Sequence, residues 1–254
     1  MLINVLHLFI SLIMVNFYKY PLILIFFIFS GIPNQINAQV NERSSLDSNK
    51  NTVWDLRLED YLNKVDSSTP TITGGCVTLT SGAMASTLLL MALDLSEKKE
   101  IDSTRKELIR HIILNIKSKR DSLKIAADKD NDIFQNFLKA YKLPKSTKDE
   151  SNYRKTTIHN LLIESTKSPL DAAFLIERLL YQIKESQNLI NSRYSSDLRA
   201  STYMLNAAFD AIINIANDNI SQLAESESEE FRLSRDLIIK REKLTFNKIM
   251  ETEH

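Results

Sequence analysis

Turn-forming and cross-linking residues are scarce in this chain. Among its 254 residues there are 4 glycines, 5 prolines and 1 cysteine. So few turn breakers exclude a fold of many short strands joined by tight turns, and they favour long helices. With Cys76 as the single cysteine, an intrachain disulfide is excluded. The length is sufficient for one domain with its own hydrophobic core.

An excess of charge of either sign is also missing. The 32 basic side chains balance the 32 acidic ones, and no basic patch is interleaved with aromatic residues. The sequence therefore gives no reason to expect a nucleic-acid partner. The four histidines show no metal-ligand spacing, and no Ser-His-Asp order, P-loop or dinucleotide fingerprint occurs. We predict no metal and no bound cofactor.

The first 38 residues have the pattern of an export signal. They hold one charged residue, Lys19, followed by the short apolar run Pro21–Ile32 and a small residue, Ala38. A positive region, a short apolar region and a small residue at the cut are typical of a signal peptide. We predict that the protein is exported to the periplasm or the cell envelope, and that the segment is its only contact with a membrane.

Alternatives to this export reading stay open. The segment is an uncleaved membrane anchor if the residues before the apolar run join it, because a spanning helix needs about 20 apolar residues. Translation starts at Met1 or at Met14, and the protein is cytoplasmic if the signal does not work. Residues 39–53 are polar and are interpreted as a linker. The remaining residues, 54–254, are predicted to form one helical domain.

The stretch Pro70–Leu95 is predicted to be the centre of the fold. It carries many small residues, and Leu88–Leu93 is apolar on every face. A helix that is apolar all round is buried. The preceding turn, Thr71–Gly75, leaves backbone N–H groups at a helix N-terminus, where an anion or a polar ligand atom is favoured. The glycines serve either such a ligand or packing alone.

Amphipathic stretches on both sides of this helix complete an all-α bundle of about six helices, two or three of them long. Pro144 ends one of the long helices, and Pro169 is expected to interrupt the next, with Ser168 as a cap. The predicted helical regions are Trp54–Val65, Ile101–Tyr141, Thr147–Asn191, Tyr194–Asn217 and Ser221–Glu251.

Asp130 is the carboxylate that spacing singles out. It lies on the apolar stripe of the long helix, one turn before Phe134. A carboxylate on a buried face is costly unless it is paired or functional, and burial raises its pKa towards the range useful for proton transfer. Pairing with a lysine or with a helix end is the alternative explanation. Asp197 also points towards the core, or serves as a simple acid in the first turn of its helix.

Two segments resemble signatures of the cyclodeaminase/cyclohydrolase family. The family run PTPGGGS is matched at Pro70, Thr71, Gly74 and Gly75, and the family pattern ADxDxxxF…AYxLPK is matched over Ala127–Thr147. Ser196-Asp197 falls on the family's SDAG, and Pro169-Leu170, Asn214 and Asn219 fall on further motifs. The resemblance covers nearly the whole chain after the linker, and it implies a helical fold and a homodimer.

The same resemblance implies a folate-dependent enzyme of one-carbon metabolism. The substrate would be a tetrahydrofolate derivative, hydrolysed as by methenyltetrahydrofolate cyclohydrolase or cyclised with loss of ammonia as by formiminotetrahydrofolate cyclodeaminase. The family's catalytic carboxylate maps to Asp130, and Asp197 maps to the pterin contact. The residues expected to hold the substrate are Thr73, Gly74, Gly75, Cys76, Lys145, Asp197 and Asn214.

Several positions depart from the family pattern around the expected pocket. Ile72 replaces a proline, Thr73 a glycine, Cys76 a serine, and Arg199 the glycine of SDAG. A looser turn, a branched side chain near the ligand and a guanidinium able to pair with Asp197 would all weaken the site. We therefore expect weak or absent activity. The alternative is an exported, non-catalytic helical binding or structural protein of the cell envelope.

Overall fold

The computed structural model describes residues 52–68 and 71–251. The predicted export segment, 1–38, and residues 39–51 of the predicted linker lie outside the described residues. The first element, the short 3-10 helix η1 (Val53–Asp55), begins at the last residue of that linker. The α-helices that follow are α4 (Leu58–Val65), α5 (Gly74–Glu97), α6 (Ser103–Tyr141), α7 (Lys148–Ser186), α8 (Ser195–Ile220) and α9 (Glu225–Glu251).

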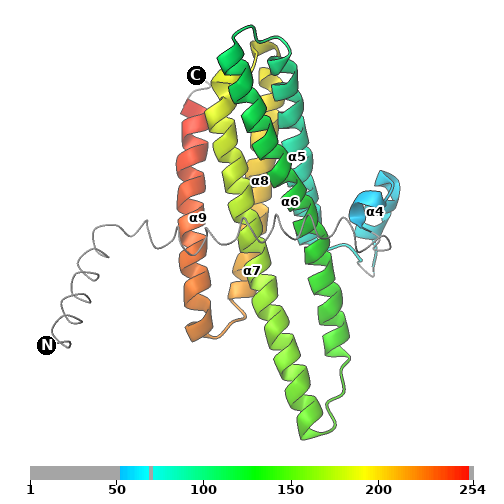
Figure 1. The fold of residues 1–254 in the computed structure, drawn as a ribbon. Coiled ribbons are helices and arrows are strands. Elements are labelled where there is room, and N and C mark those ends of the chain that lie inside the picture. Colours follow the sequence, from blue (N-terminus) through cyan, green and yellow to red (C-terminus); the bar gives the residue numbers. More distant parts are fainter. Residues whose placement is uncertain (1–51, 69–70, 252–254) are drawn as a thin grey trace, which may run out of the picture. The chain divides into compact units, whose positions relative to one another are not determined.

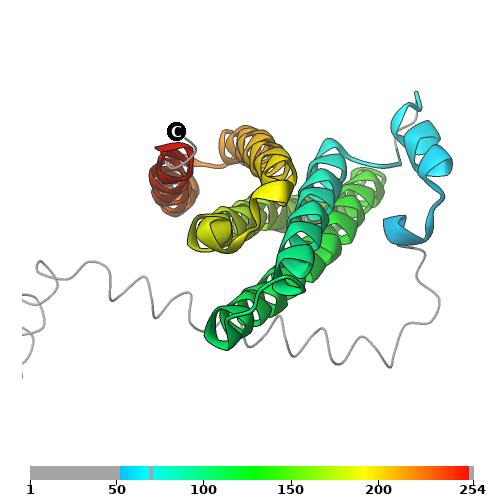
Figure 2. The same cartoon turned by 90° about the horizontal axis from the view of Figure 1, so that it is seen from above.

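Helices α5 to α9 form a bundle in which consecutive helices run in opposite directions (Figure 1). Helix α5 packs between α6 and α8, while α7 packs against α6, α8 and α9 (Figure 2). The described residues contain helices and no strand. This confirms the predicted all-α bundle of about six helices, with α6 and α7 as the two longest.

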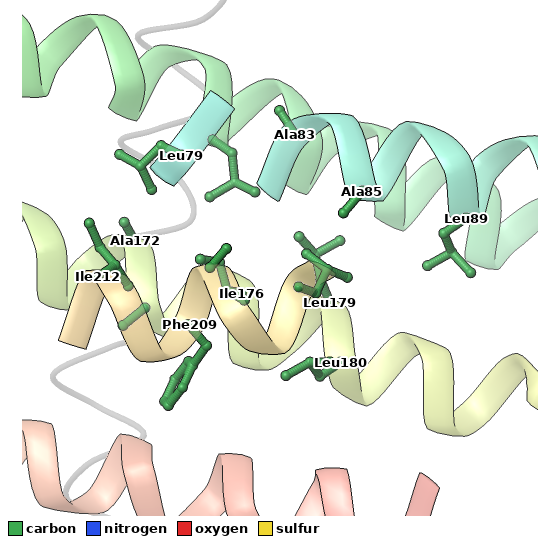
Figure 3. Close-up of a cluster of buried hydrophobic side chains, with 14 of the residues drawn as sticks. Leu79, Ala83, Ala85, Leu89, Ala172, Ile176, Leu179, Leu180, Phe209 and Ile212 are labelled. Carbon is green, nitrogen blue, oxygen red and sulfur yellow. The ribbon is translucent and has the colours of Figure 1, made fainter. Parts of the chain in front are cut away.

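Helix α5 is the core of this bundle, as predicted. Leu79, Leu89 and Leu93 are fully buried members of the core cluster. Figure 3 shows Leu79 and Leu89 in this cluster with Ile176 and Leu179 of α7. Burial of one such leucine contributes roughly 1.5–3 kcal/mol. Among the described residues α5 is the one helix long and apolar enough to cross a membrane, yet 61% of its apolar window is buried inside the bundle. That burial fits a core helix.

Helix α4 buries less of its apolar face than its sequence predicts. The expected buried face includes Leu58, Tyr61 and Leu62, but only Tyr61 is buried, and the two leucines are 63% and 57% exposed. The single helix predicted over Trp54–Val65 is also divided in two, because residues 56 and 57 separate η1 from α4. Tyr61 turns inward because its hydroxyl has a partner in the core, Thr80 Oγ1, at 3.3 Å.

Helix α7 corrects a second expectation, since Pro169 does not interrupt it. Proline removes the N–H that would bond to the carbonyl four residues earlier, which here belongs to Ser165. The structure supplies a substitute donor, because Asn219 Nδ2 of α8 donates to Ser165 O at 2.7 Å. Ser168 is buried within the continuous helix and caps nothing. Asn219 therefore repairs the hydrogen bond that Pro169 removes.

Helix α9 is attached to α7 through apolar contacts and one buried ion pair. Glu177 of α7 is 2% exposed, and its Oε2 lies 3.3 Å from Nη2 of Arg241. The neighbouring carboxyl of Glu242 is also buried, and burial raises its pKa to about 7, with a further contribution from the charge of Asp210. A neutral Glu242 therefore packs against α7 and α8 more easily than an ionised one.

The repair of Pro169 predicts coupling between two positions on different helices. We expect Asn219→Ala to lower the free energy of unfolding by about 1–2 kcal/mol, because it leaves the Ser165 carbonyl without a donor. In a Pro169→Ala background the new backbone N–H satisfies that carbonyl, so the cost should fall. A double-mutant cycle by urea unfolding measures the coupling. Equal costs in both backgrounds would contradict the proposed role of Asn219.

Candidate functional site

The candidate site lies where the N-terminus of α5 meets the second half of α6. Thr73 is the N-cap of α5, with extended backbone angles (φ −84°, ψ 160°), and its hydroxyl accepts the N–H of Cys76 at 3.0 Å. Threonine is a favoured residue at this position. The departure from the family's glycine thus gives α5 a side-chain cap that glycine cannot provide.

Asp130 reaches this cap from α6. Its Oδ2 accepts the hydroxyl of Thr73, and the carboxylate also accepts the backbone N–H of Cys76. The next residue, Asn131, accepts the N–H of Thr73 through its Oδ1 at 2.9 Å. Adjacent side chains of α6 therefore satisfy backbone and side-chain donors at the start of α5. A negative carboxylate is also favoured by the positive end of the α5 dipole.

Gly75 allows the carboxylate of Asp130 to come this close. A Cβ at Gly75 would lie 2.5 Å from Asp130 Oδ2 and 2.6 Å from Oδ1. No side chain larger than hydrogen fits there while Asp130 keeps its place. At Gly74 a Cβ would meet nothing within 4 Å. The two neighbouring glycines therefore have different roles, and only Gly75 is required by contact.

The surroundings of Asp130 act on its pKa in opposite directions. Burial raises the pKa of this carboxyl above its ordinary value, while the Thr73 hydroxyl and the Cys76 amide, which bond to the ionised form, lower it. Burial is the largest effect, so the net direction is upward. A carboxyl with a raised pKa exchanges protons more readily near neutral pH. This property is the one the reaction implied by the sequence requires.

The thiol of Cys76, which lies near Asp130, and the phenol of Tyr61, which contacts Thr80, remain neutral. Burial raises the pKa of Cys76 to about 11 and that of Tyr61 to about 12. Cys76 is fully buried, which agrees with its interpretation as a small apolar residue and not as a reactive thiol. In the part of the chain that the structure describes, no group of His, Cys, Asp or Glu side chains is arranged to hold a metal ion.

The first aspartate of the α6 motif, Asp128, anchors the segment before α4. Its Oδ1 accepts the N–H of Val53 at 3.0 Å, and Trp54 Nε1 donates to the carbonyl of Lys124 at 3.1 Å. The ammonium of Lys124 lies 5.0 Å from the centre of the Trp54 ring. Asp130 bonds to the cap of α5, whereas Asp128 bonds to the N–H of Val53 and contributes to the raised pKa of Cys76 through its charge.

The structure brings some of the predicted binding residues to Asp130 and uses them internally. Thr73, Gly75 and Cys76 all lie against its carboxylate. We expected the N–H groups of Thr73 and Cys76 to bind a ligand, but both already donate within the protein. The N–H of Thr73 donates to Asn131, and the N–H of Cys76 donates to the Thr73 hydroxyl and the Asp130 carboxylate. Gly74 is exposed at the edge of the site.

The other predicted residues lie elsewhere in this chain. Lys145 is exposed in the loop after Tyr141, and α6 carries that end about 16 Å beyond Asp130. Ser201 of α8 bonds to the carbonyl of Ala85 at 2.9 Å, so Asp197, one turn earlier, lies about 20 Å along α5 from the site.

Two further residues of α8 were singled out by the sequence. Asn214 lies level with the start of α5, but on an exposed side of α8. Arg199 is exposed and, within the described residues, forms no ion pair with Asp197. Side chains two positions apart on a helix do not face each other, which explains why the expected pair is absent.

One contributor to the site, Asn131, was missed in the sequence analysis, and the effect of another, Ile72, was mistaken. Asn131 was not considered because nothing in its spacing distinguishes it from a solvated polar residue of α6. Ile72 was expected to loosen the turn, yet it is 5% exposed and belongs to the core cluster. Its side chain anchors the turn that the missing proline would have stiffened.

A hollow beside this turn is lined by Leu56, Asp60, Asn63, Lys64, Ser67 and Thr71.

The contrast between the two glycines predicts different costs for the same substitution. Gly75→Ala must displace the Asp130 carboxylate, so we expect the free energy of unfolding to fall by about 1–3 kcal/mol. Gly74→Ala meets open space and serves as the matched control, with an expected change within about 0.5 kcal/mol. Urea unfolding of both variants checks this. Equal losses would show that the carboxylate does not occupy the position described.

Comparison with known proteins identifies the family to which the chain is similar. The sequence profile of the formiminotransferase-cyclodeaminase family matches residues 57–235. Formimidoyltransferase-cyclodeaminase of Gallus gallus is 26% identical over 169 residues, which is 66% of this chain and 30% of that protein. The chain therefore spans less than a third of the length of this curated relative.

A solved structure shows the same fold. Formiminotetrahydrofolate cyclodeaminase from Thermotoga maritima superposes with a TM-score of 0.69 and 21% identity, over 78% of this chain and 96% of that one. At this identity the likeness concerns the fold alone. The family match spans more than half of the 254 residues and contains the Thr73–Asp130 site. The chain therefore belongs to the formiminotransferase-cyclodeaminase family.

Proposed function

We propose that this protein binds a tetrahydrofolate derivative and acts weakly, if at all, on its one-carbon unit, with Asp130 as the acid–base group. The observation that carries the proposal is a half-buried carboxylate that bonds to a hydroxyl and a backbone amide at the N-terminus of α5, and whose pKa burial raises. The relatives named above are a formimidoyltransferase-cyclodeaminase and a formiminotetrahydrofolate cyclodeaminase, which supports this substrate class.

Both reactions of this type need one group that accepts and returns a proton. In hydrolysis of the methenyl cation, water adds to the methenyl carbon as Asp130 takes its proton. A C–N bond then breaks, and the departing nitrogen gains a proton as the formyl product forms. Because the substrate is a cation, one proton is released overall. In cyclisation of the formimino substrate in its amidinium form, the neighbouring secondary amine outside the pterin ring attacks the amidinium carbon. Asp130 carries the proton of that amine to the nitrogen that leaves as ammonia, and the positive charge stays on the methenyl product.

Weak turnover is expected because the donors of the site are already engaged. The amides of Thr73 and Cys76 bond within the protein, and the carboxylate of Asp130 faces them. A substrate must displace part of this network before Asp130 meets its reacting carbon. Small misplacements of a catalytic group reduce the rate steeply.

A second candidate function is a non-catalytic, exported binding or structural protein of the cell envelope. The internal use of the turn amides favours it, and so does the signal-like segment 1–38, because reduced folates are cytoplasmic metabolites. On this alternative the site keeps its network for stability alone. Calorimetric titration with tetrahydrofolate separates the two, since only the first candidate requires folate binding.

The activity assay follows the absorbance of methenyltetrahydrofolate in the presence of purified protein. We expect turnover that is slow or undetectable. Any turnover present should disappear in Asp130→Asn and persist in Asp121→Asn, a matched control that removes an exposed carboxylate from the same helix. Activity that survives Asp130→Asn would refute the assigned role, and rapid turnover would refute the expected weakening.

We further propose that two copies of the chain associate through one face of the α5–α8 pair. Helix α5 presents the exposed Met84 and Met91 on the side away from α7, and α8 presents Met204 on the same side. The contact between Ser201 and Ala85 sets the register, so that Met84 and Met204 lie level. Neighbouring positions on this face, Val77, Ser81, Leu88, Ala200, Ala207 and Ala211, carry no charge.

This face predicts the effect of a charge on assembly. We expect the purified protein to be a homodimer by light scattering. Met84→Glu should shift it to monomer, because a carboxylate would be buried without a partner in the interface. Leu233→Glu is the matched control, since Leu233 is 65% exposed on α9, outside this face. A monomeric wild-type protein at micromolar concentration would contradict the proposal.

A further inference from the structure

The hydroxyl of Thr73 lies between two oxygens that can each accept its proton. Its Oγ1 is in hydrogen-bond contact with Asp130 Oδ2, and it lies 3.2 Å from Asn131 Oδ1. The same Oγ1 accepts the N–H of Cys76 at 3.0 Å. A hydroxyl has one proton and two lone pairs. Thr73 therefore donates to one of these oxygens at a time and has a lone pair left for a second donor.

Each protonation state of Asp130 has its own complete arrangement of these bonds. When Asp130 is ionised it only accepts, so the Thr73 hydroxyl donates to it, and Asn131 Oδ1 keeps the N–H of Thr73 at 2.9 Å. When Asp130 is protonated, its O–H donates to Thr73 Oγ1, and the Thr73 hydroxyl turns to Asn131 Oδ1. Neither state leaves a donor unpaired, and no heavy atom needs to move.

We propose that Asn131, Thr73 and Asp130 form a reversible hydrogen-bond relay, in which Thr73 positions the Asp130 carboxyl and turns its own hydroxyl as Asp130 gains or loses a proton. An unpaired buried polar group costs about 1–3 kcal/mol, and the relay avoids that cost in both states. Its consequence for proton transfer to a folate rests on the proposed function, while the relay itself does not.

Beside burial, the bonds of this relay and the Cys76 amide are the influences that act on the pKa of Asp130. Cys76 of α5 and Tyr61 of α4 stay neutral, because burial raises their pKa values to about 11 and about 12. On α6, Asp128 is turned to the N–H of Val53. No change of charge in Cys76 or Tyr61 therefore accompanies the titration of Asp130.

The relay explains how a threonine is accommodated at a position where the family pattern has glycine. Glycine would offer no hydroxyl, so Asp130 would have only backbone donors at the start of α5. Serine would offer the same hydroxyl as threonine. Valine has nearly the shape of threonine and lacks the hydroxyl, which makes serine and valine a matched pair for the test.

The test is the titration midpoint of Asp130 in purified full-length protein, followed by the ¹³C carboxyl resonance that Asp130→Asn removes. Thr73→Val should raise the midpoint, because the ionised form loses its donor. Thr73→Ser should keep it near that of the wild type. Asn131→Ala should lower it, because the protonated form loses the oxygen to which the Thr73 hydroxyl turns.

The direction of the shift in Thr73→Val separates the relay from a purely structural role. Loosening of the site would admit water and lower the midpoint in every variant, so a lowered or unchanged midpoint in Thr73→Val overturns the relay. If that variant does not fold for want of its cap, an unchanged or raised midpoint in Asn131→Ala overturns it instead. The readout needs no substrate. If the protein shows no turnover but the midpoints shift as predicted, the proposed enzymatic function is refuted and the relay is not.

Discussion

Burial of α5 on almost every side is the constraint on which this structure depends. An all-round apolar helix is stable only when neighbours cover it, and α6, α7 and α8 provide that cover. The helices that cover α5 must also be long, because α5 runs from Gly74 to Glu97 and is apolar along its length. The face left open carries methionines and small residues without charge, and it is the face through which we propose that two copies associate.

The site follows from where this buried helix begins. The first N–H groups of a helix need partners outside it. Helix α5 begins at its interface with α6, and the side chains of Thr73 and Asp130 accept the N–H of Cys76 in its first turn. Gly75 lets the carboxylate approach the backbone. The candidate acid–base group is thus also part of the cap of the central helix, so chemistry and stability depend on the same few contacts.

The sequence predicted the parts of this picture that repeat along the chain. Periodicity and scarce turn breakers indicated long helices, and unbroken apolarity identified α5 as the core. Relations that depend on one atom on another helix were not visible. Asn219 compensates for Pro169 through a single hydrogen bond, and Asn131 receives one amide. Nothing in spacing marks either residue. Motif matches assigned Asp197 and Asp130 to one pocket, but within one chain the position of Asp197 on α8 lies about 20 Å from Asp130 along the bundle.

Carboxylates in this bundle are stabilised in different ways, and the difference bears on function. Burial raises the pKa of the Glu177 carboxyl, and the guanidinium of Arg241, whose positive charge favours the ionised form, opposes that effect. Asp130 has neutral donors instead, a hydroxyl and a backbone amide. A fixed positive charge stabilises one protonation state, whereas a hydroxyl beside a second acceptor serves both. A group that must take and return a proton needs the second environment. For this physical reason we propose proton chemistry at Asp130, even though the surrounding amides already donate within the protein.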